Sequence, residues 1–121
     1  MSVPAPDIPD NLALERTQIG RRMVLGVEGE IDILTAPEFA RSAEQALTDG
    51  ALELWIDLSQ VTFIDSTGIH LLLHVRDRVR ELQRRLAVIC PIGPIRRALT
   101  LTGLDEALPL YVSREEAHRH G

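Results

Sequence analysis

The chain has 121 residues, of which 45% are hydrophobic and 26% are charged, and its formal net charge is −5 at pH 7. Such a length and composition are typical of one globular domain with its own core, and they exclude an intrinsically disordered chain. Because binding to the phosphate backbone of nucleic acid requires a basic surface, the negative net charge argues against nucleic acid as a partner. No stretch of the sequence has the length and apolarity of a membrane span, so we expect no contact with a membrane and a cytoplasmic location.

The chain is expected to begin with a flexible tail. Residues 1–10 contain three prolines and two aspartates and few apolar side chains. They therefore cannot bury enough apolar surface to offset the conformational entropy that ordering would cost. The folded domain is expected to span residues 11–121. It opens with two strands that form a hairpin around Gly20 and Arg21 and end near Asp32, because apolar residues alternate on both sides of that turn.

A helix is predicted to follow, beginning at Ala36 and ending at Asp49 and Gly50. Thr35 stands at the N-cap position and Glu38 follows three residues later, which predicts that both side chains accept hydrogen bonds from free amides at the start of the helix. The apolar residues that recur at helical spacing are Ala36, Phe39, Ala40, Ala43, Ala46 and Leu47.

The middle of the chain predicts a central strand and the longest helix. An apolar run over residues 52–56 is typical of a strand that is covered on both faces, and a turn over residues 57–60 is expected to end it. A helix over residues 68–83 is predicted because apolar side chains recur there at helical spacing, with His70 and His74 on its solvent-exposed side.

The last third of the chain continues the alternation of strands and helices. A strand is predicted over residues 86–90, and its single cysteine, Cys90, is expected to be a buried thiol in a reducing compartment. A helix over residues 94–102, a strand over residues 108–112 and a terminal helix after Ser113 complete the chain. The order strand-strand-helix-strand-helix-strand-helix-strand-helix predicts an α/β fold, in which a mixed sheet of about five strands packs with four helices.

The stretch Asp65-Ser66-Thr67-Gly68 connects a strand-like segment to the long helix. In structural terms, Asp65 or Ser66 caps the helix and Gly68 allows a tight turn. An aspartic protease is excluded because an additional residue separates the serine from the glycine and no second loop of this kind occurs. A serine hydrolase would use Ser66 with His70 as its base, but no nucleophile elbow accompanies these residues.

Cofactor and metal sites are not expected. A chain without lysine cannot contain the usual Walker-type phosphate loop. His70 and His74 have the spacing of two metal ligands on one helix, but no third ligand is evident. The series Asp57, Ser59 and Val61 departs from a metal-binding pattern because valine cannot bind a divalent cation. We therefore expect no metal, no cofactor and no catalysis by the chain itself.

Three motifs in register resemble those of one family. They are Gly29-Glu30-Ile31-Asp32 followed by Thr35-Ala36, then Ile56-Asp57-Leu58, and then Phe63-Ile64-Asp65-Ser66-Thr67-Gly68. Their order and spacing resemble the STAS domain of bacterial anti-sigma factor antagonists over roughly residues 12–117. The fold that this resemblance implies is a STAS-like mixed sheet packed with helices.

The resemblance also implies a regulatory switch. An unphosphorylated antagonist of this family binds an anti-sigma factor, which is itself a serine kinase and releases itself by phosphorylating the antagonist, and a protein phosphatase restores the first state. By position, the phosphorylated residue is Ser66, with Thr67 as the second choice. Asp32 matches an acidic position that the family places beside the phosphorylated serine, where it would contact the partner.

The residues expected to bind the partner on this basis are Asp32, Thr35, Asp65, Ser66, Thr67, Gly68, His70 and His74. The two histidines are included because they extend the exposed face of the helix that begins near Ser66. The alternative is an accessory STAS subunit of a membrane transport complex, or a nucleotide-sensing STAS module, that uses the same fold without phosphorylation.

Overall fold

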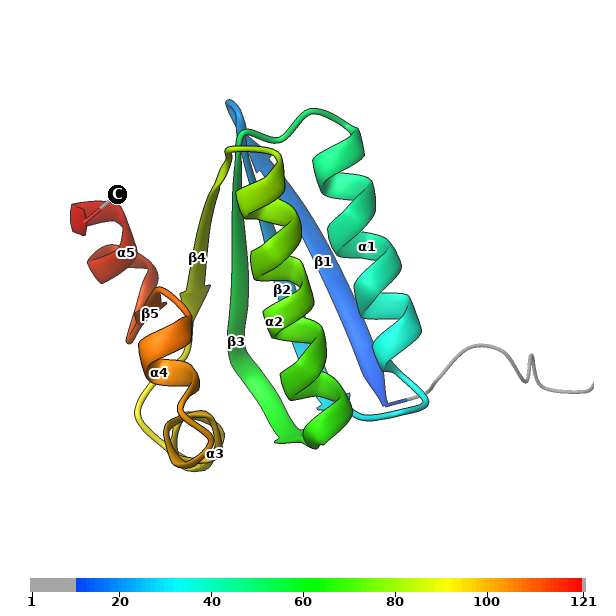
Figure 1. Ribbon diagram of the computed structural model, residues 1–121, viewed down its shortest axis with the longest axis vertical. Coiled ribbons are helices and arrows are strands. Elements are labelled where there is room, and N and C mark those ends of the chain that lie inside the picture. The colour runs from blue at the N-terminus through cyan, green and yellow to red at the C-terminus, as the bar shows by residue number, and fades with distance from the viewer. Residues whose placement is uncertain (1–10, 121) are drawn as a thin grey trace, which may run out of the picture.

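The computed structural model describes residues 11–120, which form a five-stranded sheet flanked by helices (Figure 1). The strands are β1 (Leu12–Ile19), β2 (Arg22–Ile31), β3 (Glu53–Ile64), β4 (Arg85–Ile89) and β5 (Leu110–Tyr111), in that order across the sheet. The helices are α1 (Ala36–Thr48), α2 (Ser66–Glu81), α3 (Pro94–Leu101), α4 (Leu104–Ala107) and α5 (Arg114–His120). The predicted mixed α/β fold is confirmed, whereas the predicted tail lies outside the described residues.

The sheet combines one antiparallel hairpin with parallel pairing. β1 and β2 are antiparallel and turn at Gly20, whose φ of 61° favours glycine. β2, β3, β4 and β5 are all parallel to one another. The loops that follow β2, β3 and β4 therefore lie at the same edge of the sheet, which we call the carboxyl edge, and the start of α2 is found there (Figure 1, lower end).

The main core lies between one face of the sheet and the helices α1 and α2, which pack side by side over it (Figure 1). Leu25 of β2, Leu54 and Ile56 of β3, and Phe39 of α1 are fully buried there. Burying a side chain of this size stabilises the fold by about 1.5–3 kcal/mol. A smaller cluster, separate from the main core, is formed by Val24, Trp55, Ala87, Ile89 and Ala117.

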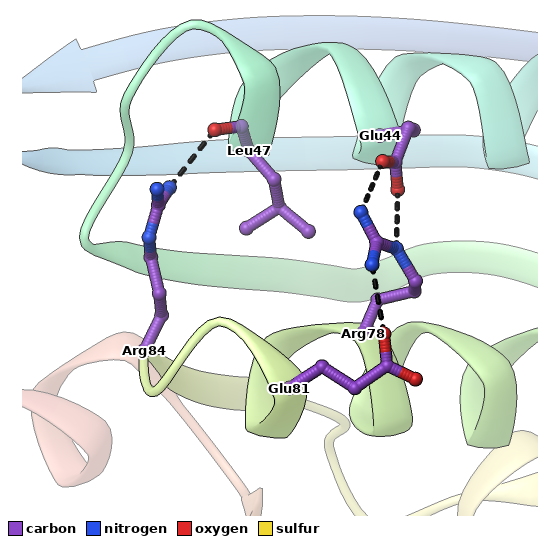
Figure 2. A network of polar contacts seen from close by, with 5 residues as sticks. All are labelled: Glu44, Leu47, Arg78, Glu81 and Arg84. Atoms are coloured by element: carbon purple, nitrogen blue, oxygen red, sulfur yellow. Dashed lines mark hydrogen bonds and ion pairs between the residues drawn. The ribbon is translucent and has the colours of Figure 1, made fainter.

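A network of polar contacts fixes α1 against α2 (Figure 2). The guanidinium of Arg78 donates two hydrogen bonds to the carboxylate of Glu44, at 2.7 and 3.2 Å, and one to Glu81 at 2.8 Å. The hydrogen bonds from Arg78 hold the pKa of Glu44 below its ordinary value. Arg84 donates to the carbonyl oxygens of Leu47, in the last turn of α1, and of Ala51, in the loop that follows, at 2.9 and 2.6 Å, so it satisfies backbone acceptors on both sides of the helix end.

The structure corrects the prediction for the central strand. β3 does not end at a turn over residues 57–60 but continues as one strand to Ile64. The carboxylate of Asp57 accepts a hydrogen bond of 2.9 Å from the amide of Ser59, a local contact that is common in turns. The backbone of β3 nevertheless stays paired with β2. The register between the two strands shifts between Gly26 and Glu28 and again between Gly29 and Glu30, so the pairing continues past the local irregularity.

The C-terminal third differs in two further respects. Within residues 11–120 the structure has five helices where four were expected, because the short α4 follows Gly103, whose φ is 80°. The last strand has two residues rather than the predicted range of 108–112. The terminal helix is confirmed, with the hydroxyl of Ser113 accepting a hydrogen bond of 3.1 Å from the amide of Glu116. Cys90 is buried as expected, and this burial raises the pKa of its thiol.

Candidate functional site

Asp32 closes the loop between β2 and α1 at the carboxyl edge. Its Oδ1 atom accepts hydrogen bonds from the amides of Leu34 at 2.9 Å and Thr35 at 3.0 Å. Its backbone carbonyl accepts a further bond of 2.8 Å from the amide of Ala36. These bonds give the loop one defined conformation, in which the partly exposed carboxylate serves both as a structural acceptor and as a charge at the surface.

The hydroxyl of Thr35 lies beneath this loop. It donates a hydrogen bond of 2.7 Å to the carbonyl of Glu30 and accepts one of 2.9 Å from the amide of Asp32. The prediction that it caps α1 is therefore wrong: Thr35 occupies the N-cap position without a side-chain cap bond, and Glu38 pairs with Arg41 instead. Because Thr35 is only 1% exposed, a partner cannot reach it, and its role is to support the loop.

The start of α2 presents Ser66 to solvent. Asp65 is the N-cap residue, and its carboxylate accepts a hydrogen bond of 3.1 Å from the amide of Gly68, which decides between the two caps, Asp65 and Ser66, that the sequence left open. Ser66 is the first residue of the helix and is exposed, whereas Thr67 is half-buried. Among residues 11–120, no other group forms a hydrogen bond with the Ser66 hydroxyl. The hydroxyl is thus accessible and is not part of the local hydrogen-bond network.

Gly68 brings the first turn of α2 against the ends of two strands. A Cβ atom at this position would lie 2.7 Å from Cγ1 of Ile64 and 2.8 Å from Cγ2 of Ile31. Both distances are shorter than van der Waals contact, so only glycine permits this packing without a shift of the neighbouring groups. Gly68 is itself buried, and it therefore positions Ser66 rather than contacting a partner.

Large apolar side chains are exposed at the carboxyl edge, a feature that the sequence analysis missed. We call this set the apolar rim; its members are Ile33 (71% exposed), Leu34 (76%), Phe63 (48%) and Ile92 (87%). They come from the loops after β2 and β4 and from the end of β3, so they lie at the same edge as Ser66. Exposed apolar side chains gathered in one region are typical of a surface that binds another protein.

His70 and His74 are both exposed on α2, as predicted. His74 also borders an apolar groove between α1 and α2. Within residues 11–120, no three His, Cys, Asp or Glu side chains come together in the way that a metal ion requires.

Asp57 belongs to one of the three motifs, but the structure does not bring it to the carboxyl edge. It lies in the middle of β3 and borders a groove of about 340 Å³ formed with β1 and β2. Its carboxylate accepts a hydrogen bond of 2.6 Å from Arg114, which ties α5 to the sheet. Burial opposes ionisation, but hydrogen bonds from Ser59 and Arg114 outweigh it and leave the pKa of Asp57 lowered.

In the part of the chain that the structure describes, every helix is too short or too polar to cross a bilayer.

The family model of the STAS domain matches residues 13–117. The chain belongs to the STAS domain family. The resemblance that the three motifs indicated is therefore confirmed, and it extends over nearly all of the described residues.

Several proteins similar to this STAS domain are named anti-sigma factor antagonists. It is 28% identical over 109 residues to the anti-sigma-F factor antagonist RsfB of Mycobacterium tuberculosis, which covers 90% of this chain and 88% of the relative. A crystal structure of an anti-sigma factor antagonist from Mycobacterium paratuberculosis has a TM-score of 0.83 and 30% identity, with 98% of this chain and 97% of that chain covered. The Bacillus cell fate determinant SpoIIAA in its phosphorylated form shares the fold, with a TM-score of 0.67 and 20% identity over 90% of this chain and 100% of that chain.

Proposed function

We propose that this STAS domain is an anti-sigma factor antagonist without catalytic activity of its own. It binds an anti-sigma factor through the carboxyl edge while Ser66 is unmodified, and phosphorylation of Ser66 releases the partner. The observation that carries this proposal is the exposed Ser66 hydroxyl at the first residue of α2, at the same edge of the sheet as the apolar rim. The names of the similar proteins support the antagonist hypothesis rather than a transport subunit or a nucleotide sensor.

The apolar rim supplies the affinity in this proposal. Ile33, Leu34 and Ile92 are each more than two-thirds exposed, so a partner that covers them removes apolar surface from water. Covering one such side chain completely contributes about 1.5–3 kcal/mol, before the costs of association are subtracted. The hydrogen bonds that the carboxylate of Asp32 accepts from the amides of Leu34 and Thr35 hold this loop in position before the partner arrives, which reduces the entropy lost on binding.

In this proposal, phosphorylation of Ser66 causes the anti-sigma factor to dissociate. A phosphoserine carries about −1.5 to −2 charges at neutral pH, and at Ser66 it would join the carboxylates of Asp32 and Asp65 at the same edge. A partner would have to desolvate this charge in order to cover the apolar rim. Because about 1.4 kcal/mol changes an affinity tenfold, the unfavourable contact is sufficient to separate the complex.

The domain itself is expected to remain folded after the modification. The amides of the first helical turn have no acceptors within the helix, and the positive end of the helix dipole tolerates an anion. Among the described residues, phosphorylation breaks no hydrogen bond of the Ser66 side chain. The solved structure of SpoIIAA in its phosphorylated form describes that protein alone, and it shows that a chain of this fold exists in a phosphorylated state.

The partner in this proposal is an anti-sigma factor with serine kinase activity, and a protein phosphatase removes the phosphate and reactivates the domain in the cytoplasm. Thr67 is the second choice for the modified residue, although its side chain is half-buried. Asp32, Asp65, His70 and His74 form the polar part of the contact face, while Thr35 and Gly68 hold it in place.

The test combines phosphorylation with binding. The domain is incubated with candidate anti-sigma kinases and ATP, and the phosphate is located by mass spectrometry; we expect it on Ser66. Ser66→Ala is expected to bind the anti-sigma factor persistently and Ser66→Asp at least tenfold more weakly, with Thr67→Ala as the matched control that behaves like the wild type. Equal affinity of the Ser66→Ala and Ser66→Asp variants would contradict the proposal.

A further inference from the structure

Ser66, His70 and His74 form a row along the exposed side of α2. Successive members are four residues apart, so they occupy neighbouring turns on one side of the helix. Helical side chains lean toward the N-terminus of their helix and cover the turn that precedes them. This geometry places the turn that contains Ser66 within reach of the imidazole of His70, whereas the imidazole of His74 lies one turn further along α2.

His70 is the cation best placed to respond to a charge on Ser66. In the first two turns of α2, residues 66–73, it is the only side chain that can carry a positive charge. Within residues 11–120, it makes no hydrogen bond or ion pair. The imidazole of His70 is therefore available for a hydrogen bond to a new group.

Other charged groups lie on α2 itself, on α1, which packs against it, and at the carboxyl edge of the sheet. They are Asp32 and Asp65 at the carboxyl edge, Glu38, Arg41 and Glu44 on α1, Arg96 and Arg97 at the start of α3, and His74 and Asp77 on α2. Arg41 already pairs with Glu38 at 3.1 Å, and Arg96 donates to the carbonyl of Cys90. Arg78, one turn beyond His74, is bound by two carboxylates (Figure 2).

We propose that His70 is the intramolecular partner of the phosphate on Ser66, a role that rests on the proposed function of this site. In the phosphorylated domain, a ring N–H of the His70 imidazolium donates a hydrogen bond to a phosphate oxygen one turn earlier. The phosphate is then held against its own helix, and a phosphatase must displace His70 to reach it. The same histidine faces solvent in the unmodified domain and is available to the anti-sigma factor.

This arrangement makes the lifetime of the phosphorylated state depend on pH. Histidine gains its proton as the pH falls from 8 toward 5, the range in which a phosphate monoester also changes charge. A charged imidazole next to the phosphate favours the dianion, so the second ionisation of the phosphate moves to lower pH. For an exposed pair at this helical spacing, we expect a shift of about 0.3 pH unit, which corresponds to about a twofold change in an equilibrium constant.

The test uses phosphoserine installed at position 66 during translation, so that it needs no kinase. Phosphorus NMR titrations are recorded for the phosphorylated wild type and for the His70→Gln and His74→Gln variants. We expect the midpoint of the phosphate titration to rise by about 0.3 pH unit in His70→Gln and to stay unchanged in His74→Gln, the matched control one turn away. An unchanged midpoint in His70→Gln, or an equal rise in both variants, would overturn the proposal.

A second measurement addresses the consequence for phosphatase action. At a pH where histidine is charged, a protein phosphatase is expected to release phosphate about twofold faster from His70→Gln than from the wild type, and the difference is expected to vanish at alkaline pH. A rate difference that persists unchanged at alkaline pH would contradict the role of the charged imidazole. Because the phosphate is installed without a kinase, a failure of the anti-sigma factor binding test would leave these measurements interpretable.

Discussion

The backbone amide of Asp65 donates a hydrogen bond of 3.1 Å to the carbonyl oxygen of Ile31. This bond extends the hydrogen bonding between β2 and β3 by one residue beyond their last pair, Ile31 and Ile64. Asp32 and Ser66 each follow one of the two bonded residues in the chain. The loop that carries the apolar rim and the helix that carries Ser66 are therefore joined through the backbone, and a disturbance on one side is expected to reach the other.

Gly68→Ala tests how closely α2 packs on the strand ends. The added methyl group would meet Ile64 and Ile31 at 2.7 and 2.8 Å, so we expect the variant to lose about 1–3 kcal/mol of unfolding free energy. Without the close contact, alanine would stabilise the helix relative to glycine by up to about 1 kcal/mol. The sign of the change in unfolding free energy therefore shows whether the contact exists. Urea denaturation measures it, and a variant more stable than the wild type would show that the contact is absent.

Thr35→Val tests the buried hydroxyl with little change in shape. The variant leaves the carbonyl of Glu30 and the amide of Asp32 without their partner, at an expected cost of about 1–3 kcal/mol in the free energy of unfolding. Thr62→Val is the control, because the hydroxyl of Thr62 is exposed and makes one long bond of 3.3 Å. Thermal unfolding should separate the two variants clearly, and similar losses in both would argue against a special role for Thr35.

Asp57→Asn tests the pH dependence of stability. Because the pKa of Asp57 is lowered in the folded state, ionised Asp57 stabilises the fold above the pKa of the unfolded chain, and this contribution is lost as the pH falls through the folded value. We therefore expect the wild type to lose stability in acid more steeply than Asp57→Asn. Asp105→Asn, at an exposed position, is the control. Denaturation curves at several acidic pH values give the slopes, and parallel slopes for wild type and Asp57→Asn would refute the expectation.

The sequence was sufficient for features that depend on regular helical or strand spacing and insufficient for those that depend on the conformation of loops. The N-cap of α2 was correctly narrowed to Asp65 or Ser66, because an N-cap bond joins residues close in sequence, and the structure assigns it to Asp65. The hydroxyl of Thr35 was misassigned because it donates to the carbonyl of Glu30 and accepts from the amide of Asp32, and the conformation of the loop between β2 and α1, which no helical or strand spacing predicts, brings these groups together. The apolar rim was missed because side chains such as Ile33 lie in loops, where no helical or strand periodicity marks their exposure.

Leu34→Ser tests whether the apolar rim contributes to binding. Leu34 is 76% exposed, so its replacement should leave the unfolding free energy within about 0.5 kcal/mol of the wild type. If a partner covers this side chain, the affinity for the anti-sigma factor should fall at least tenfold, or by about 1.4 kcal/mol. The control is Leu101→Ser at the end of α3, where the leucine is 79% exposed but lies outside the apolar rim. Isothermal titration calorimetry compares the two variants, and equal affinities would place the binding surface elsewhere on the domain.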